Sequence, residues 1–190
     1  MNTKSREYKN LSDEEIVKLV ISKDHNLYEF LVRRYQKKLL SYVGYYIPDY
    51  DKAADVVQDV FIKSYINLQG FNSHLKFSSW LYRIAHNESI NAIKKYHREV
   101  SLEGNENFEA VFLDHTKNIE EIFEKKELRE NLKRAVHRLP FKYEEVIILY
   151  YFEEKSYEEI SDVLRISLGA VGTRINRAKK MLVELYTQHP

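Results

Sequence analysis

Cysteine is absent from this chain of 190 residues. Its absence excludes disulfide bonds, thiolate zinc sites and a cysteine nucleophile. Glycine and proline are scarce, with five and three residues, too few for the turns of a β-sandwich or β-barrel. The longest apolar run, Val146 to Phe152, is far shorter than the ~18 residues of a membrane-spanning helix. The N-terminus, with Lys4, Arg6 and Lys9, does not fit a secretory signal. We expect a soluble, cytoplasmic protein.

Motifs of catalytic and cofactor-binding sites are missing as well. The sequence contains no H-E-x-x-H, no G-x-G-x-x-G, no G-x-x-x-x-G-K and no G-x-S-x-G. The seven histidines are scattered, and no two have the spacing of metal ligands. Carboxylates occur in pairs, Glu144 with Glu145 and Glu158 with Glu159, which we interpret as solvated helix faces or first-turn acids that the helix dipole favours. We expect no enzyme, no metal and no cofactor.

The overall charge hides an uneven distribution. A net charge of +1 argues against a nucleic-acid partner, because phosphate binding needs a basic surface. However, residues 76–98 and 167–187 carry an excess of basic side chains, whereas residues 101–127 and 141–162 carry an excess of acidic ones. Two separate basic stretches are therefore available for nucleic acid.

The acidic middle of the chain divides it into two parts. Residues 101–118 lack regular periodicity and contain glycine, asparagine and several acids, which is typical of a flexible linker. The alternative is a long loop inside one domain, but structureless loops beyond ~12–15 residues are uncommon in compact domains. We predict domains at residues 1–100 and 119–190, joined by an acidic linker at 101–118.

Apolar residues recur at helical spacing in both parts, which predicts an all-α fold of two small helical domains. Capping boxes at Ser12–Glu15 and Ser156–Glu159 mark two helix starts. The run at residues 146–152 is rich in β-formers, but it has no strand partner and we interpret it as helix. The first predicted helix begins after Ser12. The second begins near Leu27 and ends near Gly44. The other predicted helices cover residues 51–68, 77–96, 119–139, 141–152, 157–164 and 168–186.

The strongest local signal lies between Ser156 and Leu185. A short capped helix, a break at Arg165–Ile166 and a second helix that Ser167 can cap form the pattern of a helix-turn-helix, whose second helix can enter a major groove. The alternative is an ordinary helical hairpin with a cationic face. The polar face of the second helix shows Thr173, Asn176, Arg177 and Lys180, with Arg174 and Lys179 beside it.

A second signal lies in residues 76–98, where basic side chains alternate with aromatic ones. Such a mixture suits single-stranded nucleic acid, because exposed bases stack on rings. Phe77 and Trp80 are better explained as core residues than as stacking platforms. The polar loop Gln69–Ser79 is the better place for unpaired bases.

Two sets of motifs follow each other along the chain, separated by the predicted linker. The first includes Asp55-x-x-Gln58-Asp59-x-Phe61 and Phe77-x-x-Trp80-Leu81-Tyr82-Arg83-Ile84-Ala85-x-Asn87. The second includes Leu139-Pro140, Ser156-Tyr157-Glu158-Glu159-Ile160, Gly169-Ala170-Val171 and Thr173-Arg174-Ile175. The first set resembles the σ2 domain, and the second the σ4 domain, of the extracytoplasmic-function (ECF) sigma factors of the sigma-70 family.

This resemblance implies a bacterial transcription initiation factor that binds core RNA polymerase, directs it to promoters and helps to open the DNA. It also implies an anti-sigma factor as a partner. The polymerase-binding residues would be Asp55, Gln58 and Asp59. Contacts to the −10 element would come from Gln69, Asn72, Ser73, His74, Lys76, Arg83, His86, Asn87, Lys94 and Lys95. Contacts to the −35 element would come from Ser167, Thr173, Arg174, Asn176, Arg177, Lys179 and Lys180.

Some assignments have alternatives. Asp55 and Asp59 by themselves fit a solvated helix face, and Asn87 fits a structural hydrogen-bonding residue equally well. Arg174 and Arg177 are the best candidates for groove contacts, and the sequence does not separate them. The alternative function is a stand-alone helix-turn-helix regulator that binds duplex DNA, which rests on the second domain alone.

Three positions depart from the family pattern. Asn91 replaces an aspartate that is frequent in the σ2 helix. Gly172 stands where a basic residue is common, so one groove contact would be missing. Arg165 stands at a turn position that glycine often occupies. If that turn needs a left-handed backbone, a residue with a side chain costs ~1–2 kcal/mol.

Overall fold

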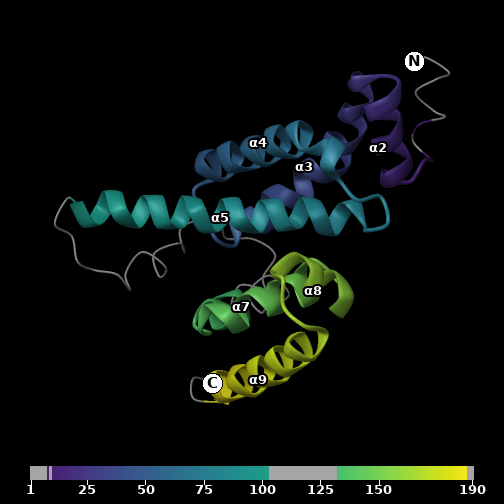
Figure 1. Ribbon diagram of the computed structural model, residues 1–190. Helices are drawn as coiled ribbons and strands as arrows, with labels where there is room; N and C mark the ends of the chain where they lie inside the picture. The colour runs from purple at the N-terminus through teal and green to yellow at the C-terminus, as the bar shows by residue number, and fades with distance from the viewer. Residues whose placement is uncertain (1–7, 9, 103–131, 188–190) are drawn as a thin grey trace, which may run out of the picture. The chain divides into compact units, whose positions relative to one another are not determined.

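The computed structural model describes residues 8, 10–102 and 132–187, and these are helical with short connections, as predicted (Figure 1). They divide into two compact units, an N-terminal one made by α2 to α5 and a C-terminal one made mainly by α7 to α9. The helices of the N-terminal unit are α2 (Asp13–Ser22), η1 (His25–Leu27), α3 (Tyr28–Gly44), α4 (Tyr50–Ile66), η2 (Leu68–Gly70) and α5 (Phe77–Leu102). The C-terminal unit has α7 (Phe141–Ile147), the π-helical turn η4 (Ile148–Phe152), α8 (Tyr157–Leu164) and α9 (Leu168–Thr187).

Side-chain caps fix where these helices begin. Ser12 accepts a hydrogen bond from the Glu15 amide and the Glu15 carboxylate accepts one from the Ser12 amide, so the predicted capping box at α2 is confirmed. The same reciprocal pair forms at α8 between Ser156 and Glu159. Helix α4 starts after Asp49, whose carboxylate accepts from the amides of Asp51 and Lys52, the second and third residues of the helix. Each cap satisfies amides that a helix leaves without partners at its N-terminus.

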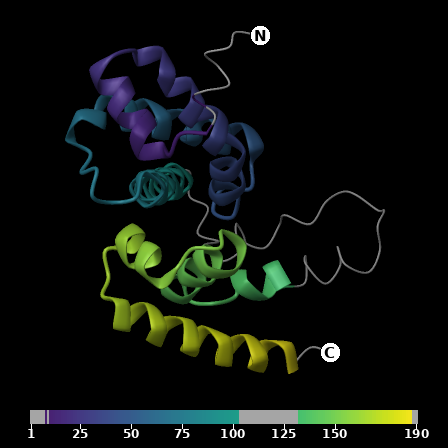
Figure 2. The ribbon, with the colours of Figure 1, turned by 90° about the vertical axis from the view of Figure 1, so that its right-hand side faces the viewer.

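The core of the N-terminal unit lies between α3, α4 and α5. Helices α3 and α4 pack along each other, and α5, seen nearly end-on in Figure 2, has α2, α3 and α4 around it. Aromatic rings join α3 to α5, with ring centroids 5.1 Å apart for Tyr42 and Tyr82 and 5.9 Å apart for Tyr35 and Phe77. Fully buried apolar side chains include Leu31, Leu39, Tyr42, Val43, Val60, Phe77, Leu81, Tyr82 and Ala85.

The C-terminal unit has a core of its own. Helix α7 packs against α9, and the run that is rich in β-formers continues α7 as the π-helical turn η4 rather than as a strand. The inner face of α9 carries Val171, Ile175 and Ala178, which recur at helical spacing and are all fully buried. Further fully buried apolar side chains of this unit include Val146, Ile147, Ile148, Leu149 and Ile160.

The ends of some elements differ from the prediction. Helix α5 continues to Leu102 rather than ending at residue 96, so residues 101–102 of the predicted linker are helical. Residues 103–118 of that linker lie outside the described residues, as do residues 119–131 of the predicted helix 119–139. Within that helix, residues 132–137 are helical. Capping motifs in the sequence mark where helices start, but they mark the ends less clearly, so the predicted helix ends are less accurate.

Candidate nucleic-acid interface

The outer face of α4 presents the three residues predicted to bind the polymerase. Asp55, Gln58 and Asp59 are all exposed, because the opposite face buries Ala53, Val57, Val60, Phe61 and Ser64 in the unit's core. Ile62 and Ile66 were not predicted as part of this face. They continue it one and two turns further along α4, where they are 48% and 71% exposed. Their spacing of seven residues from Asp55 and Asp59 is the signal that would have found them. The α4 face therefore combines polar groups with uncovered apolar side chains.

A hollow opens beside the predicted base-binding loop. Its volume is about 380 Å³, and it is lined by Lys63, Asn67, Gly70, Trp80, Ile84, Asn87 and Glu88. Gly70 belongs to η2 at the start of the loop, whereas Trp80, Ile84, Asn87 and Glu88 come from α5. The Lys63 ammonium donates a hydrogen bond to the Glu88 carboxylate across one side of the hollow.

The loop that borders this hollow is polar and locally ordered. Gln69, Asn72, Ser73, His74 and Lys76 are all exposed. Asn72 organises the turn, since its side-chain oxygen accepts from the His74 amide at 3.0 Å and its carbonyl accepts from the Leu75 amide at 2.9 Å. The Asn72 side chain thus has a structural contact within the loop.

Aromatic side chains support the loop from beneath. Phe77 is fully buried, as expected for a core residue. Trp80 is half-buried and packs against Phe71 and Phe77, with ring centroids 5.3 and 5.7 Å away, while it also lines the hollow. Trp80 is therefore part of the core and of the surface at once.

The structure corrects the prediction for His86. This side chain is only 9% exposed, and its Nδ1 lies 3.1 Å from the Tyr42 hydroxyl inside the unit. Burial lowers the pKa of the imidazole to about 4. His86 is a buried core residue. Arg83 and Asn87 are one turn apart on the outer face of α5, whereas His86, which lies between them in sequence, faces α3. The remaining predicted contacts on α5, Asn87, Lys94 and Lys95, are exposed, and Arg83 is half-buried.

In the C-terminal unit, α8 and α9 form the predicted helix-turn-helix. Arg165 follows α8 with φ 56° and ψ 42°, so the turn does need a left-handed backbone at this position. The Ser161 hydroxyl donates to the Ile166 carbonyl at 2.6 Å and closes the turn. The Ser167 hydroxyl accepts from the Ala170 amide at 3.2 Å, so it caps α9 as predicted.

Exposed polar side chains line the outer face of α9. Ser167, Thr173, Asn176, Arg177, Lys179 and Lys180 are all exposed. Thr173 donates to the Gly169 carbonyl at 2.8 Å. The Lys179 ammonium lies 5.5 Å from the centre of the Tyr151 ring, and a hydrogen bond with that tyrosine raises the pKa of the lysine. Gly172 lies near Tyr157, where a Cβ would make only ordinary contact at 3.5 Å.

Arg174 differs from these residues because it has an internal acceptor. Its Nη1 donates to Glu145 Oε1 at 2.7 Å, and its side chain is 28% exposed. Arg177 is exposed, and its hydrogen bond lowers the pKa of the Tyr143 hydroxyl. The structure thus separates two arginines that the sequence left equivalent.

The interpretation of Glu144 and Glu145 as solvated residues is wrong. They are 5% and 7% exposed, and burial raises the pKa of both carboxyls, that of Glu145 to about 6. Glu144 lies 2.7 Å from His137 Nδ1, and Glu145 binds Arg174. Both carboxylates are tolerated because each has a basic partner. The pair at Glu158 and Glu159 does lie in the first turn of α8.

Among the described residues, no helix is long and apolar enough to cross a membrane. The same part of the chain contains no group of three or more histidine, aspartate or glutamate side chains arranged to hold a metal ion.

Both units match known sequence families. Residues 31–99 match Sigma-70 region 2, and residues 129–182 match Sigma-70, region 4. The chain is 35% identical to the ECF RNA polymerase sigma-E factor of Escherichia coli (strain K12), over 90% of this chain and 93% of the relative. The chain belongs to the ECF sigma factors of the sigma-70 family. It is also 32% identical to the ECF RNA polymerase sigma factor SigW of Bacillus subtilis (strain 168), over 87% of this chain and 92% of that protein.

Solved structures support the fold of this ECF sigma factor. CnrH, in complex with the cytosolic domain of CnrY, aligns with a TM-score of 0.69 and 24% identity over 94% of this chain and 99% of that chain. The sigma factor RpoE of Bartonella quintana, in complex with the anti-sigma factor NepR, aligns with a TM-score of 0.67 and 24% identity over 85% and 98%.

As an ECF sigma factor, the chain serves promoter-specific transcription initiation by RNA polymerase. The alternative of a stand-alone regulator is not favoured, since the matches cover both units rather than the helix-turn-helix alone.

Proposed function

We propose that this sigma factor divides its work between the two units. The domain at residues 1–100 holds core RNA polymerase and the −10 element, and the domain at 119–190 holds the −35 element. Residues 101–118 link them. The observation that carries the proposal is the pair of uncovered faces, one on α4 and one on α9, on separate units.

The α4 face is the proposed polymerase contact. Asp55, Gln58 and Asp59 supply hydrogen-bonding and acidic groups, and the uncovered side chains of Ile62 and Ile66 supply apolar area. Such a combination of apolar centre and polar rim is typical of protein interfaces. A solvated helix face would not need two isoleucines exposed one turn apart.

The hollow beside the loop is the proposed site for an unpaired −10 base. Flipping a base out of a duplex costs a few kcal/mol, which a pocket must offset. Trp80 offers a ring for stacking, and Asn87 offers an amide that can bond a base edge. The loop residues Gln69, Asn72, Ser73, His74 and Lys76 surround the strand, and Arg83, Lys94 and Lys95 lie along α5 to bind phosphates.

Helix α9 is the proposed reader of the −35 element. Arg177 is the better candidate for a base or phosphate contact, because it is exposed whereas Arg174 is half-buried and binds the Glu145 carboxylate. The other contacts we assign to this face are Ser167, Thr173, Asn176, Lys179 and Lys180, together with the half-buried Arg174.

The net charge of +1 fits a factor that binds promoters weakly alone and strongly when polymerase holds both units. We propose that the protein itself catalyses no reaction and works in the cytoplasm beside the polymerase. An anti-sigma factor is the proposed inhibitory partner, since CnrH and RpoE were each solved with a partner of their own, CnrY and NepR.

A reconstitution tests the proposal. The full chain is mixed with core RNA polymerase, and binding and transcription from genomic promoter fragments are measured. We expect Gln58→Ala to weaken polymerase binding about tenfold, as the loss of one interface hot-spot contact would. Gln36→Ala, an equal change at an exposed site on α3, is the matched control.

No binding of the wild-type chain to core polymerase would refute the proposal. Tight, sequence-specific duplex binding by the chain without polymerase would instead support the stand-alone regulator. Equal binding by the Gln58→Ala and Gln36→Ala variants would remove the α4 face from the polymerase contact.

A further inference from the structure

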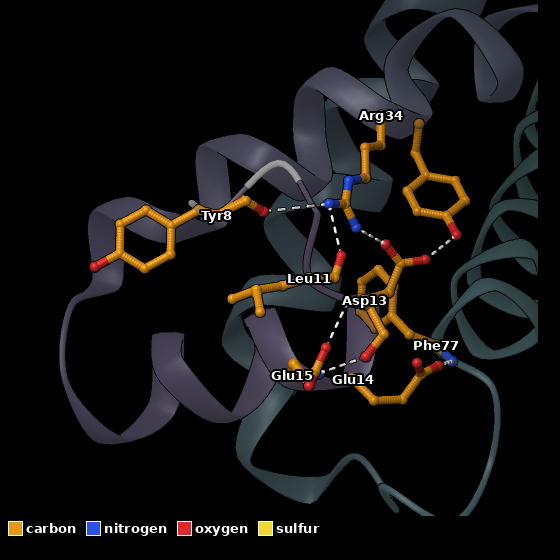
Figure 3. A network of polar contacts seen from close by, with 9 residues as sticks. Tyr8, Leu11, Asp13, Glu14, Glu15, Arg34 and Phe77 are labelled. Carbon is orange, nitrogen blue, oxygen red and sulfur yellow. Dashed lines mark hydrogen bonds and ion pairs between the residues drawn. The ribbon is translucent and has the colours of Figure 1, made fainter. Parts of the chain in front are cut away.

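Helix α2 contacts both ends of the loop that the proposed function assigns to base capture. It packs against η2, where the loop begins. At the other end, Glu14 Oε1 accepts a hydrogen bond of 2.8 Å from the amide of Phe77, the first residue of α5 (Figure 3). Helix α2 precedes residue 31, where the match to Sigma-70 region 2 begins.

Glu14 caps the start of α5 from another helix. The first amides of a helix have no partners inside the helix. Lys76, the residue before α5, has no side-chain acceptor and cannot serve as a cap. Glu14, 63 residues away in sequence, supplies the acceptor and places a negative charge at the positive end of the helix.

A second set of contacts holds Glu14 in place. Its neighbour Asp13 accepts from Arg34 Nη1 at 2.7 Å and from the Tyr35 hydroxyl, both on α3. Arg34 also donates to the Leu11 carbonyl at 2.8 Å. Figure 3 shows these groups converging where α2 meets α3 and α5. The Glu14 carboxylate is therefore presented from a fixed helix.

The position of the Phe77 amide matters for the hollow. The Phe77 ring lies 5.7 Å from the ring of Trp80, which lines the hollow. The same amide ends the exposed loop, so fixing it limits where the loop can lie. A loop ordered in advance loses less conformational freedom on binding.

We propose that Glu14 is a positioning residue for base capture: through the Phe77 amide it fixes the start of α5 and hence the loop and the Trp80 wall of the hollow. This inference rests on the proposed function. It assigns a role in promoter opening to a helix outside the region-2 match.

The test measures base preference by the assembled enzyme. The full chain with core RNA polymerase selects from fork-junction DNA whose single-stranded overhang is randomised, and the selected strands are sequenced. The readout is the ratio between the most and least preferred base at the captured position. Loss of folded protein lowers the yield but not this ratio, and thermal unfolding of each variant is followed in parallel.

We expect Glu14→Ala to lower the preference ratio about tenfold, as the loss of a charge-assisted hydrogen bond would. Glu14→Gln keeps an acceptor without the charge and should give an intermediate ratio. Glu15→Ala is the control: it removes the capping box of α2 but leaves the Phe77 amide bonded, and should keep the wild-type ratio.

Three results would overturn the inference. An unchanged ratio in Glu14→Ala would show that the hydrogen bond does not position the loop. An equal loss in Glu15→Ala would trace the effect to the stability of α2. A wild-type enzyme that binds polymerase but has no base preference would refute base capture itself, and the role of Glu14 with it.

Discussion

The guanidinium of Arg174 on α9 donates a hydrogen bond of 2.7 Å to the carboxylate of Glu145 on α7. The side chain of Glu145 is 10% exposed and that of Arg174 is 28% exposed. This pair joins the two helices that form the core of the C-terminal unit. It also decides which arginine of α9 faces solvent.

Arg174→Ala and Arg177→Ala should therefore have different effects. Removing Arg174 takes a charged hydrogen-bond donor away from the buried Glu145 carboxylate and should lower the free energy of unfolding by about 2 kcal/mol. Removing Arg177, which is exposed but hydrogen-bonds the Tyr143 hydroxyl, should lower stability less than removing Arg174 does, and should weaken −35-dependent transcription about tenfold. Chemical denaturation and transcription from −35 mutant promoters measure the two effects. Arg138→Ala, at an exposed position outside α9, is the control. Equal effects of Arg174→Ala and Arg177→Ala on both stability and −35-dependent transcription would contradict the distinction between the two arginines.

Arg165→Gly should stabilise the C-terminal unit. The backbone of Arg165 is left-handed, with φ 56°, which costs a residue with a Cβ ~1–2 kcal/mol. Glycine adopts this conformation without strain but has more freedom in the unfolded chain, so we expect a net gain of about 1 kcal/mol. Chemical denaturation, monitored by hydrogen exchange of the α8 and α9 amides, measures this gain in stability. Arg165→Ala removes the same side chain but keeps the Cβ, and an equal gain in that variant would refute the backbone explanation.

Acid should destabilise the N-terminal unit through His86. Burial lowers the pKa of this imidazole to about 4, below the ~6.5 expected in an unfolded chain. The unfolded state therefore binds the proton more readily, and stability should fall by about 3 kcal/mol as the pH decreases from 6.5 to 4. Trp80, the single tryptophan, reports the unfolding of this unit. His86→Gln should flatten the pH dependence, whereas His74→Gln, an exposed control, should not.

Glu145 should give the C-terminal unit the opposite response. Its pKa is raised to about 6 by burial, so the folded state holds the proton more tightly than the unfolded state. The resulting stabilisation is complete below the unfolded value of 4.5 and is lost as the pH rises through 6, a change of about 2 kcal/mol. Hydrogen exchange of α7 amides between pH 4.5 and 7 measures it. If the stability of Glu145→Gln depends on pH as steeply as that of the control Glu158→Gln, the assignment to Glu145 is contradicted.

Local patterns predicted much of the fold. The capping boxes at Ser12 and Ser156 are confirmed, because a cap involves residues only three positions apart. The turn at Arg165 and the cap at Ser167 are confirmed for the same reason. The buried stripe of α9 followed from helical periodicity, which places every third or fourth side chain on one face.

Local patterns failed where burial depends on a distant partner. His86 contacts Tyr42, 44 residues away, and Glu145 contacts Arg174, 29 residues away. Polar residues on a helix are solvated by default, so neither burial was visible before the helices were packed.

The sequence by itself determined the all-helical fold, the caps at Ser12, Ser156 and Ser167, the helix-turn-helix and the family, because these depend on short spacings and on motif order. Only the tertiary structure decided that Arg177 rather than Arg174 faces solvent, that His86 is buried, and that Glu14 caps α5 across 63 residues. The physical reason is the same in each case. A buried polar group must find a partner, and in a packed helical unit that partner comes from another helix whose position no local pattern contains.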